Sequence, residues 1–180
     1  MVYILLGTGF EEIEALAPLD LMRRAGIEVM TVGLGGSTVY GGHNIGIAAD
    51  ISIDEMDLTA LDMIVLPGGL GGVASVRACP AAMDALKFSW DNGKFVAAIC
   101  AGPTVLADLG ITDGKNTTCY PGCESGMGSA VMAADKACVR DGNVITGTSA
   151  GCAIPFGLAL IEALKGGTTA KTVADAIVIR

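Results

Sequence analysis

The chain has 180 residues, of which 52% are hydrophobic and 17% charged, and its formal net charge is −8. A chain of this length and composition buries a sizeable core, which excludes a mainly disordered protein. The acidic balance and the lack of any basic run exclude nucleic acid and anionic membranes as expected partners.

Short apolar runs alternate with helical patterns along the whole chain. The predicted elements are, in chain order, a strand at 2–6, a helix at 11–25, a strand at 27–32, a hairpin at 38–48, a strand at 62–66, a helix at 80–91, a strand at 95–99, a helix at 103–109, a hairpin with strands 138–140 and 143–146, and a helix at 153–164. Gly26 suits a left-handed helix cap, and Asp141-Gly142 suits a hairpin turn.

Continuous apolar strands that alternate with helices predict an α/β fold with a mostly parallel sheet, covered by helices on both faces. No linker or shift in composition interrupts the pattern, so we expect a single domain over residues 1–180. In such sheets, ligands bind beyond the carboxyl ends of the strands. Glycine-rich turns follow the predicted strands at Leu6, Leu66, Ile99 and Thr146.

Six cysteines are many for this length. The first ten residues lack the features of a secretion signal, so we expect reduced thiols in the cytoplasm. The most apolar late stretch, residues 152–164, is too short to span a bilayer. With no C-x-x-C motif and a single histidine, His43, neither a metal site nor a cofactor is expected.

The sharpest feature is Cys100, which stands between a buried strand and a helix. Its small neighbours, Ala98, Ala101 and Gly102, fit the tight turn of a nucleophile elbow. Free amides at the helix N-terminus are expected to lower the thiol pKa from about 8.5 toward roughly 3.5–7.5. The alternative is a buried, inert cysteine, which is common among free thiols.

A glycine-rich turn at residues 67–72 follows the strand at 62–66. Glycine lets backbone amides approach a ligand closely, so the amides of Gly69 and Ala101 together could form an oxyanion hole. The turn lacks the Gly-Lys-Ser/Thr ending of a phosphate loop.

Acidic residues open the first helix. Glu11 and Glu12 fit surface charges that complement the helix dipole. Glu14 differs, because Pro18 removes the hydrogen bond to the Glu14 carbonyl and is expected to distort the helix there.

Residues 147–151 match the G-x-S-x-G motif of serine hydrolases. No histidine follows Ser149 in the sequence, so a serine-histidine triad is not expected.

Four blocks occur together in the sequence. They are Glu11-Glu12-Ile13-Glu14 with Pro18, Met22-Arg23-Arg24-Ala25-Gly26, Val65-Leu66-Pro67-Gly68-Gly69, and Ala98-Ile99-Cys100-Ala101-Gly102-Pro103. In this order they resemble the ThiJ/PfpI superfamily, most of all its branch containing the parkinsonism-associated protein deglycase. The resemblance covers nearly the whole chain.

The resemblance implies a flavodoxin-like three-layer sandwich with Cys100 as nucleophile or oxidation site. It implies that Glu14 is protonated and hydrogen-bonds the sulfur, and that Gly69 and Ala101 supply the oxyanion-hole amides. Three further residues are expected to line the pocket: Gly68, Tyr120 and Ser149.

A homodimer is expected on two grounds. The apolar composition and the spread of leucines around the first helix predict that a second subunit covers part of the surface. The resemblance also implies a homodimer, with Arg24 and His43 at the edge of its interface.

The resemblance implies an enzyme for small 2-oxoaldehydes or their glycation adducts, acting as a glutathione-independent glyoxalase or deglycase. A peptidase is not expected, because Ala101 stands where peptidase-like members have histidine. The alternative is a non-enzymatic redox sensor or chaperone, switched by oxidation of Cys100. No second cysteine lies within a few residues of Cys100, so peroxide is expected to give sulfinic acid there first.

Overall fold

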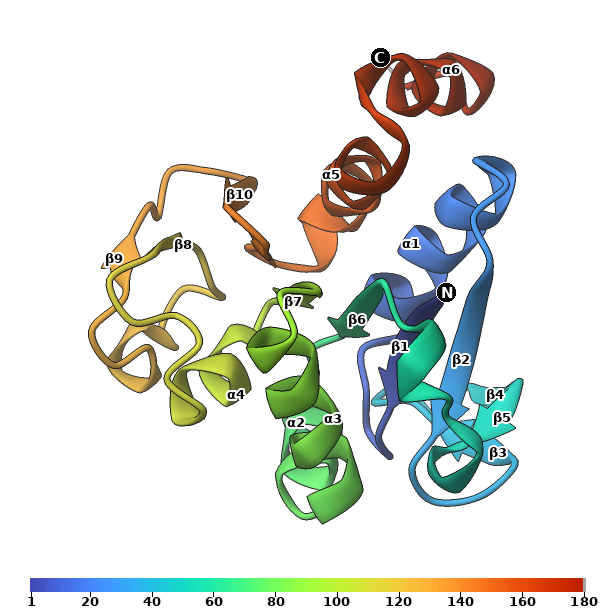
Figure 1. Cartoon of the computed structure of the whole chain (residues 1–180), viewed down its shortest axis with the longest axis vertical. Coiled ribbons are helices and arrows are strands. Elements are labelled where there is room, and N and C mark those ends of the chain that lie inside the picture. Colours follow the sequence, from blue (N-terminus) through green and yellow to red (C-terminus); the bar gives the residue numbers. More distant parts are fainter. Residues whose placement is uncertain (180) are drawn as a thin grey trace.

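The structure is a computed structural model that describes residues 1–179. A seven-stranded sheet forms its middle layer (Figure 1). The strands are β1 (Val2–Leu6), β2 (Val29–Gly33), β5 (Ile51–Ser52), β6 (Met63–Leu66), β7 (Phe95–Ile99), β10 (Cys138–Asp141) and β11 (Val144–Gly147).

These strands lie in the order β10-β11-β7-β6-β1-β2-β5. β10 pairs antiparallel with β11, and all other neighbours in this sheet pair parallel. The run β2-β1-β6-β7-β11 has the strand order 2-1-3-4-5 of flavodoxin-like proteins, which confirms the predicted fold class.

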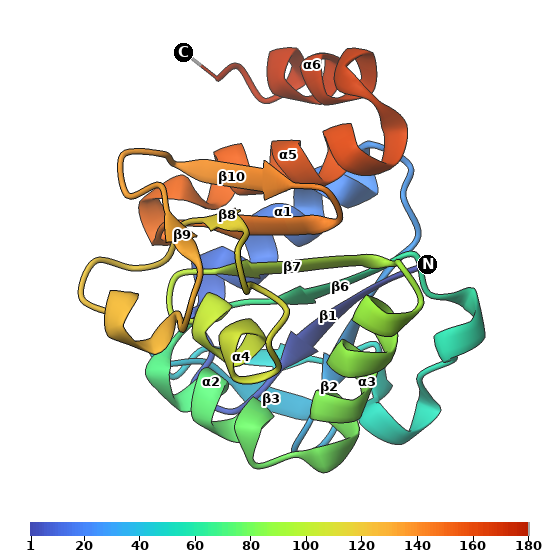
Figure 2. The same cartoon turned by 60° about the vertical axis from the view of Figure 1, so that its left-hand side comes forward.

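Helices cover both faces of the sheet (Figure 2). They are α1 (Glu12–Arg24), α2 (Leu70–Arg77), α3 (Pro80–Asp91), α4 (Pro103–Asp108), α5 (Ala153–Lys165) and α6 (Gly167–Ala176). α1 and α5 lie on one face, and α2, α3 and α4 lie on the other. α6 packs on the outer side of α5.

Every residue of β1 is buried because successive side chains enter different halves of the core. Ile4 belongs to the cluster that contains Phe156 of α5, whereas Leu5 belongs to the cluster that contains Leu86 of α3. α1 and α5 pack closely, since a Cβ at Gly157 would lie 2.8 Å from Leu21 Cδ1.

Shorter elements lie outside the main sheet. Two small sheets pair β3 (Thr38–Tyr40) with β4 (Gly46–Ala48) and β8 (Asn116–Thr117) with β9 (Val131–Met132). Short 3-10 turns lie at Ile53–Glu55, Leu58–Ala60, Glu124–Gly126 and Ala150–Cys152. None of the helices within residues 1–179 is long and apolar enough to cross a membrane.

The predicted strands and helices of the main sandwich are confirmed, and Gly26 has the expected positive φ, of 65°. The helix α1 continues through Pro18. The sequence pattern does not predict α2, because its glycines have low helix propensity. They are needed for close packing: a Cβ at Gly72 would lie 2.7 Å from Phe10 Cα. The pattern also misses α6, which opens with Gly-Thr-Thr.

Candidate active site

The topology creates a crevice at the carboxyl end of the sheet. β1 and β6 are neighbours, but α1 after β1 and α2 after β6 cover opposite faces. Loops that part in this way leave room for a ligand between them. Glu14 reaches this crevice from α1, Gly69 from the turn after β6, and Cys100 from the end of β7.

Cys100 has the backbone shape of an elbow. Its φ is 65°, a left-handed conformation that non-glycine residues rarely adopt outside strained functional turns. Its amide donates to the carbonyl oxygen of Gly147 at 3.0 Å. The turn needs Gly102, because a Cβ there would lie 2.8 Å from the Leu66 carbonyl oxygen.

Glu14 is fully buried and lies close to the cysteine. The amide of Gly68 donates to its Oε2 at 2.8 Å, and the interaction with the Cys100 thiol affects the Glu14 pKa. A Cβ at Gly68 would lie 2.6 Å from Glu14 Oε2 and 2.7 Å from Cys100 Cβ. Only glycine at position 68 therefore leaves both side chains where they are.

The two groups titrate as a coupled pair. Burial raises the pKa of Glu14 to about 7, although hydrogen bonds from Cys100 and the Gly68 amide oppose the rise. Burial, and then the nearby Glu14 charge, raises the pKa of Cys100 to about 12. Near neutral pH the site therefore holds a protonated thiol beside a carboxyl group that can accept its proton.

The raised Cys100 pKa runs opposite to the sequence-based expectation. The expected amides are present, since the backbone N–H groups of Ala101 and Gly69 act on the sulfur and lower its pKa. Burial beside a second acidic group outweighs them. The expectation considered only the helix end, because the burial of Glu14 against the thiol depends on tertiary packing.

A cavity of about 560 Å³ opens above the elbow. Its walls are Glu11, Glu14, Gly69, Leu70, Cys100, Ala101, Tyr120, Cys123, Ser149, Ala150 and Gly151. Six residues expected from the sequence thus lie together around one cavity, and Gly68 is buried beside them. Sequence reasoning missed Cys123, because nothing near it in the chain signals that its turn returns to the elbow.

Ser149 lines the cavity without the partners of a serine nucleophile. Its hydroxyl donates to Cys152 Sγ at 3.9 Å. His43, the one histidine of the chain, lies elsewhere, beside Glu12. His43 is not among the residues that line the cavity.

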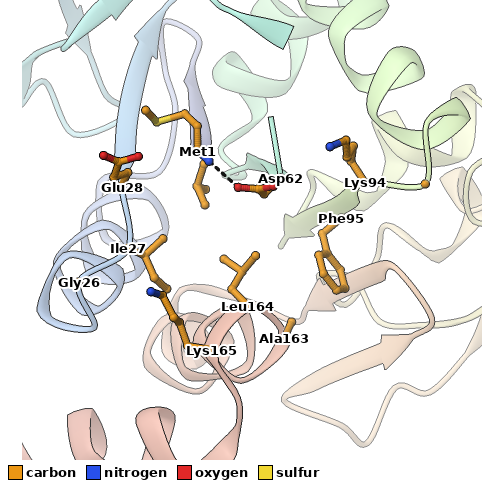
Figure 3. A pocket seen from close by; sticks show the side chains of 12 residues that line it. Met1, Gly26, Ile27, Glu28, Asp62, Lys94, Phe95, Ala163, Leu164 and Lys165 are labelled. Atoms are coloured by element: carbon orange, nitrogen blue, oxygen red, sulfur yellow. Dashed lines mark hydrogen bonds and ion pairs between the residues drawn. The ribbon is translucent and has the colours of Figure 1, made fainter. Parts of the chain in front are cut away.

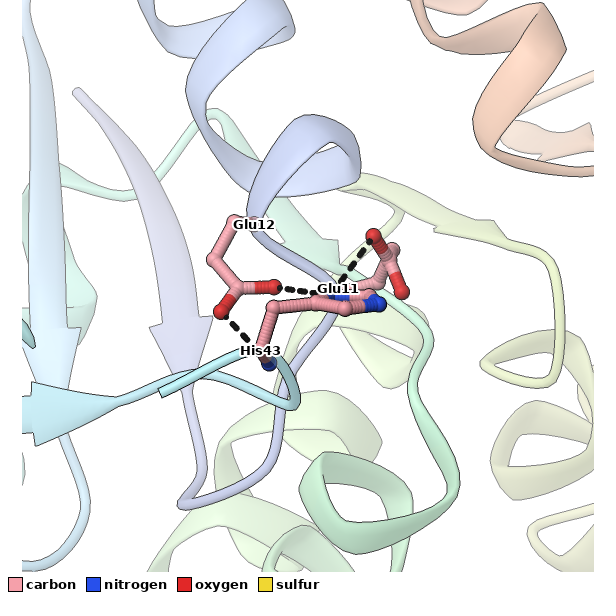
Figure 4. Close-up of side chains that lie close together, drawn as sticks. All are labelled: Glu11, Glu12 and His43. Carbon is pink, nitrogen blue, oxygen red and sulfur yellow. Dashed lines mark hydrogen bonds and ion pairs between the residues drawn. The ribbon is translucent and has the colours of Figure 1, made fainter. Parts of the chain in front are cut away.

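Glu11, Glu12 and His43 form a cluster at the edge of this site, where Glu11 also lines the cavity (Figure 4). His43 Nδ1 lies 2.9 Å from Glu12 Oε2 and 3.6 Å from Glu11 Oε1. Burial raises the pKa of Glu12, but bonds from the His43 ring and from the amides of His43 and Ile45 outweigh it and hold that pKa below its usual range. The Glu12 bond in turn raises the pKa of His43.

The potential ligand atoms of these three residues lie within 4.8 Å of one another. Ligand spacing along the chain did not predict this meeting, because His43 reaches α1 from the β3–β4 hairpin. The carboxylate of Glu12 already accepts hydrogen bonds from the ring and two amides. These hydrogen bonds connect the β3–β4 hairpin to α1.

A larger cavity, of about 740 Å³, lies at the opposite end of the sheet (Figure 3). The starts of β1 and β7, the segment between α1 and β2, and the C-terminal end of α5 surround it. Met1 and Asp62 form an ion pair at its edge. No cysteine is among the described residues that line it, so this cavity offers no thiol to a ligand.

Comparisons with known proteins find sequences and structures similar to nearly the whole chain. The model of the DJ-1/PfpI family matches residues 1–163. Protein dj-1beta of Drosophila melanogaster is 36% identical over 178 residues, or 98% of this chain and 95% of that protein. A deglycase of Pyrococcus abyssi is 32% identical over 146 residues, or 81% of this chain and 87% of that protein.

The crystal structure of the Drosophila DJ-1beta protein superposes with a TM-score of 0.92 at 36% identity, covering 99% of this chain and 97% of that one. The fold and the elbow define an α/β protein of flavodoxin-like topology with a cysteine at the carboxyl edge of its sheet. With the matches in sequence and structure, the chain belongs to the DJ-1/PfpI family.

Proposed function

We propose that the protein is a cysteine-dependent enzyme that converts small 2-oxoaldehydes, or the glycation adducts derived from them, without glutathione or another cofactor. One observation carries the proposal: Cys100, on a strained elbow, faces a buried Glu14 whose pKa is about 7, in a cavity sized for a small molecule.

The first step is attack on the aldehyde. Glu14 accepts the thiol proton as Cys100 sulfur bonds to the aldehyde carbon, so a sulfur with a raised pKa still acts as nucleophile. The carbonyl π bond opens, and its oxygen gains the negative charge. The amides of Gly69 and Ala101, which already act on the sulfur, stabilise that oxyanion.

The later steps move a proton and add water. Glu14 first returns the thiol proton to the oxyanion, which gives a hemithioacetal and leaves Glu14 as a carboxylate. Glu14 then moves the proton of the attacked carbon to the neighbouring carbonyl carbon, while the hydroxyl proton passes to the neighbouring oxygen, and a thioester on Cys100 remains. Water then attacks the thioester carbon, and the carbon–sulfur bond breaks. The products are a 2-hydroxy acid and the free thiol, with no net oxidation. A glycation adduct enters the same sequence after its nitrogen leaves.

Two findings support this activity and its setting. The similar protein of Pyrococcus abyssi is named a deglycase. All six cysteines are free thiols, as a reducing compartment such as the cytoplasm requires.

Steady-state kinetics with methylglyoxal, in the absence of glutathione, tests the proposal. We expect many turnovers per site, far above the rate of an equal concentration of free thiol. Cys100→Ser is expected to abolish turnover, whereas Cys79→Ser, distant from the cavity, keeps it. An active Cys100→Ser protein contradicts the proposed site.

A redox sensor switched by oxidation of Cys100 is the second candidate. The half-buried Cys100 favours it, because an accessible thiol beside a general base reacts with peroxide as well as with aldehydes. Stoichiometric consumption of methylglyoxal without turnover supports the sensor over the enzyme.

A further inference from the structure

A second thiol faces the cavity that holds Cys100. Cys123 follows β8 and lines the same cavity, although the two residues are far apart in the chain. Both thiols are half-buried, so each is accessible from the cavity. The other four cysteines of the chain do not line it.

Backbone hydrogen bonds hold the turn of Cys123 at the elbow. The amide of Tyr120 donates to the carbonyl oxygen of Cys100 at 2.8 Å, and the amide of Cys123 donates to the carbonyl oxygen of Tyr120 at 2.9 Å. Cys123 thus ends a turn whose first residue is bonded to Cys100.

The middle of this turn lies at the surface. Pro121 and Gly122 are exposed, and Gly122 has a φ of 101°. Two further bonds hold the turn: the Gly122 amide donates to the exposed side chain of Glu124 at 2.7 Å, and the Gly126 amide donates to the carbonyl oxygen of Cys123 at 2.9 Å. Cys123 also packs against the core cluster that contains Leu86, so a shift of its side chain toward Cys100 gives up that contact.

We propose that Cys123 is the resolving cysteine for Cys100: after a peroxide oxidises Cys100, Cys123 forms a disulfide with it across the cavity. The inference rests on the proposed function in one respect, that Cys100 is the nucleophile of this site. The sequence predicts sulfinic acid at Cys100, because no other cysteine is close to it along the chain. Cys123, which lines the same cavity, instead captures the sulfenic acid as a disulfide.

The chemistry uses hydrogen peroxide or an organic peroxide as the oxidant. Cys100 sulfur attacks a peroxide oxygen and the O–O bond breaks, while Glu14 passes the thiol proton to the departing oxygen. With hydrogen peroxide, the products are a sulfenic acid and water. Cys123 sulfur then attacks Cys100 sulfur, the S–O bond breaks, and hydroxide leaves with the Cys123 proton as a second water. Two thiols are oxidised and one peroxide is reduced.

The disulfide has two consequences for the site. It keeps Cys100 from irreversible oxidation to sulfinic acid, because the sulfenic acid is consumed first. It also occupies the cavity, so the oxidised protein loses activity until an external dithiol reduces it.

Cys119 provides a matched control. It lies in the same segment as Cys123, but its side chain is buried and does not line the cavity. Its thiol contacts the carbonyl oxygen of Tyr120 at 3.5 Å. Burial raises its pKa to about 11, which further disfavours it as the attacking thiol.

The test treats the reduced wild-type protein, Cys123→Ser, Cys123→Ala and Cys119→Ser with about three equivalents of hydrogen peroxide, because the disulfide consumes one peroxide and a sulfinic acid consumes two. Free thiols are then blocked, and the proteins are digested without reductant for mass spectrometry. We expect a linked peptide pair containing Cys100 and Cys123 in the wild type and in Cys119→Ser. In both Cys123 variants we expect two oxygens on Cys100 instead.

Absence of the linked pair, or a link from either residue to Cys119, overturns the inference. Equal sulfinic acid in the wild type and in Cys123→Ser also overturns it. The readout needs no substrate, so the two proposals fail separately. A linked pair in a protein without methylglyoxal turnover refutes only the enzyme, and turnover without a linked pair refutes only the resolving cysteine.

Discussion

The pKa values of Glu14 and Cys100 depend on each other. Each lies in a site that disfavours its own charge, and the Glu14 charge further raises the Cys100 pKa. The protonation of one therefore decides the reactivity of the other.

One prediction concerns the pH dependence of activity. Glu14 acts as a base only when it is deprotonated, and its pKa is about 7. We expect kcat/KM for methylglyoxal to rise with pH up to about 7 and then level, falling about tenfold per unit below it. Glu14→Gln should remove both the rising limb and most of the activity. A flat wild-type profile between pH 5 and 8 contradicts the role of Glu14 as base.

A second prediction concerns stability. Because the folded pKa of Glu14 lies above the ordinary value of 4.5, its favourable contribution is complete below pH 4.5 and is lost as pH rises through 7. The buried charge then costs about 3 kcal/mol at pH 8. Glu14→Gln keeps an acceptor for the Gly68 amide, so its free energy of unfolding should exceed that of the wild type at pH 8.

Chemical denaturation at pH 5 and pH 8 measures this effect. The difference between Glu14→Gln and the wild type should grow with pH, whereas Glu11→Gln, a partly exposed neighbour, serves as the control. A difference that is independent of pH shows that the effect comes from packing instead of charge.

At the scale of elements, three segments meet at the site: the start of α1, the turn after β6 and the elbow after β7. None of them provides the site alone. Their approach depends on glycines, because the turn after β6 passes between Glu14 and Cys100.

Gly68→Ala adds one methyl group that would lie under 3 Å from both Glu14 Oε2 and Cys100 Cβ. The φ of Gly68 lies outside the left-handed region, so alanine can adopt its conformation, but the Glu14 side chain and the elbow, whose Ile99 carbonyl oxygen would lie 3.0 Å from the methyl group, must shift. We expect turnover to fall roughly 10²-fold, as for a misplacement of about 1 Å, with a destabilisation of about 1–3 kcal/mol.

Gly35→Ala is the matched control, because the nearest atom to its added methyl group is Thr8 Oγ1 at 3.6 Å. It should keep both the turnover and the stability of the wild type. If Gly68→Ala keeps full turnover as well, the close fit of the three segments is not required for activity.

At the scale of the whole molecule, several large apolar side chains are exposed around one end of α1. Ile13 is 54% exposed, and Tyr40 and Ile45 of the adjoining hairpin are 52% and 51% exposed. The hairpin is joined to this end of α1 by the bond from the Gly42 amide to the Phe10 carbonyl oxygen at 2.8 Å. Neighbouring apolar side chains of this kind mark a surface that another protein covers.

We propose that a second copy of the chain covers this surface, as expected for a homodimer with His43 near its edge. Sedimentation equilibrium at micromolar concentration should give twice the monomer mass. Ile13→Glu buries a charge in that interface and should weaken the dimer by at least about tenfold. Val178→Glu, a change at another exposed apolar residue, is the control. A monomeric wild-type protein rejects the dimer.

Local patterns in the sequence determined most of the sandwich. Unbroken apolar strands can only be buried on both sides, so the order of strands and helices predicted a parallel sheet and its ligand-binding edge. The small residues around Cys100 predicted the elbow, since a turn that tight has no room for large ones. The sequence pattern did not predict α2, because glycine has a low helix propensity. The glycines of α2 are present because they pack closely against other segments.

Tertiary structure alone decided the chemical state of the site. The burial of Glu14 against Cys100 raises both pKa values, and no local pattern contains that burial. The meeting of Cys100 with Cys123, and of His43 with Glu12, likewise joins segments distant in the chain. A sequence pattern records neighbours along the backbone, whereas proton affinity and thiol pairing depend on neighbours in space and on the water that folding excludes.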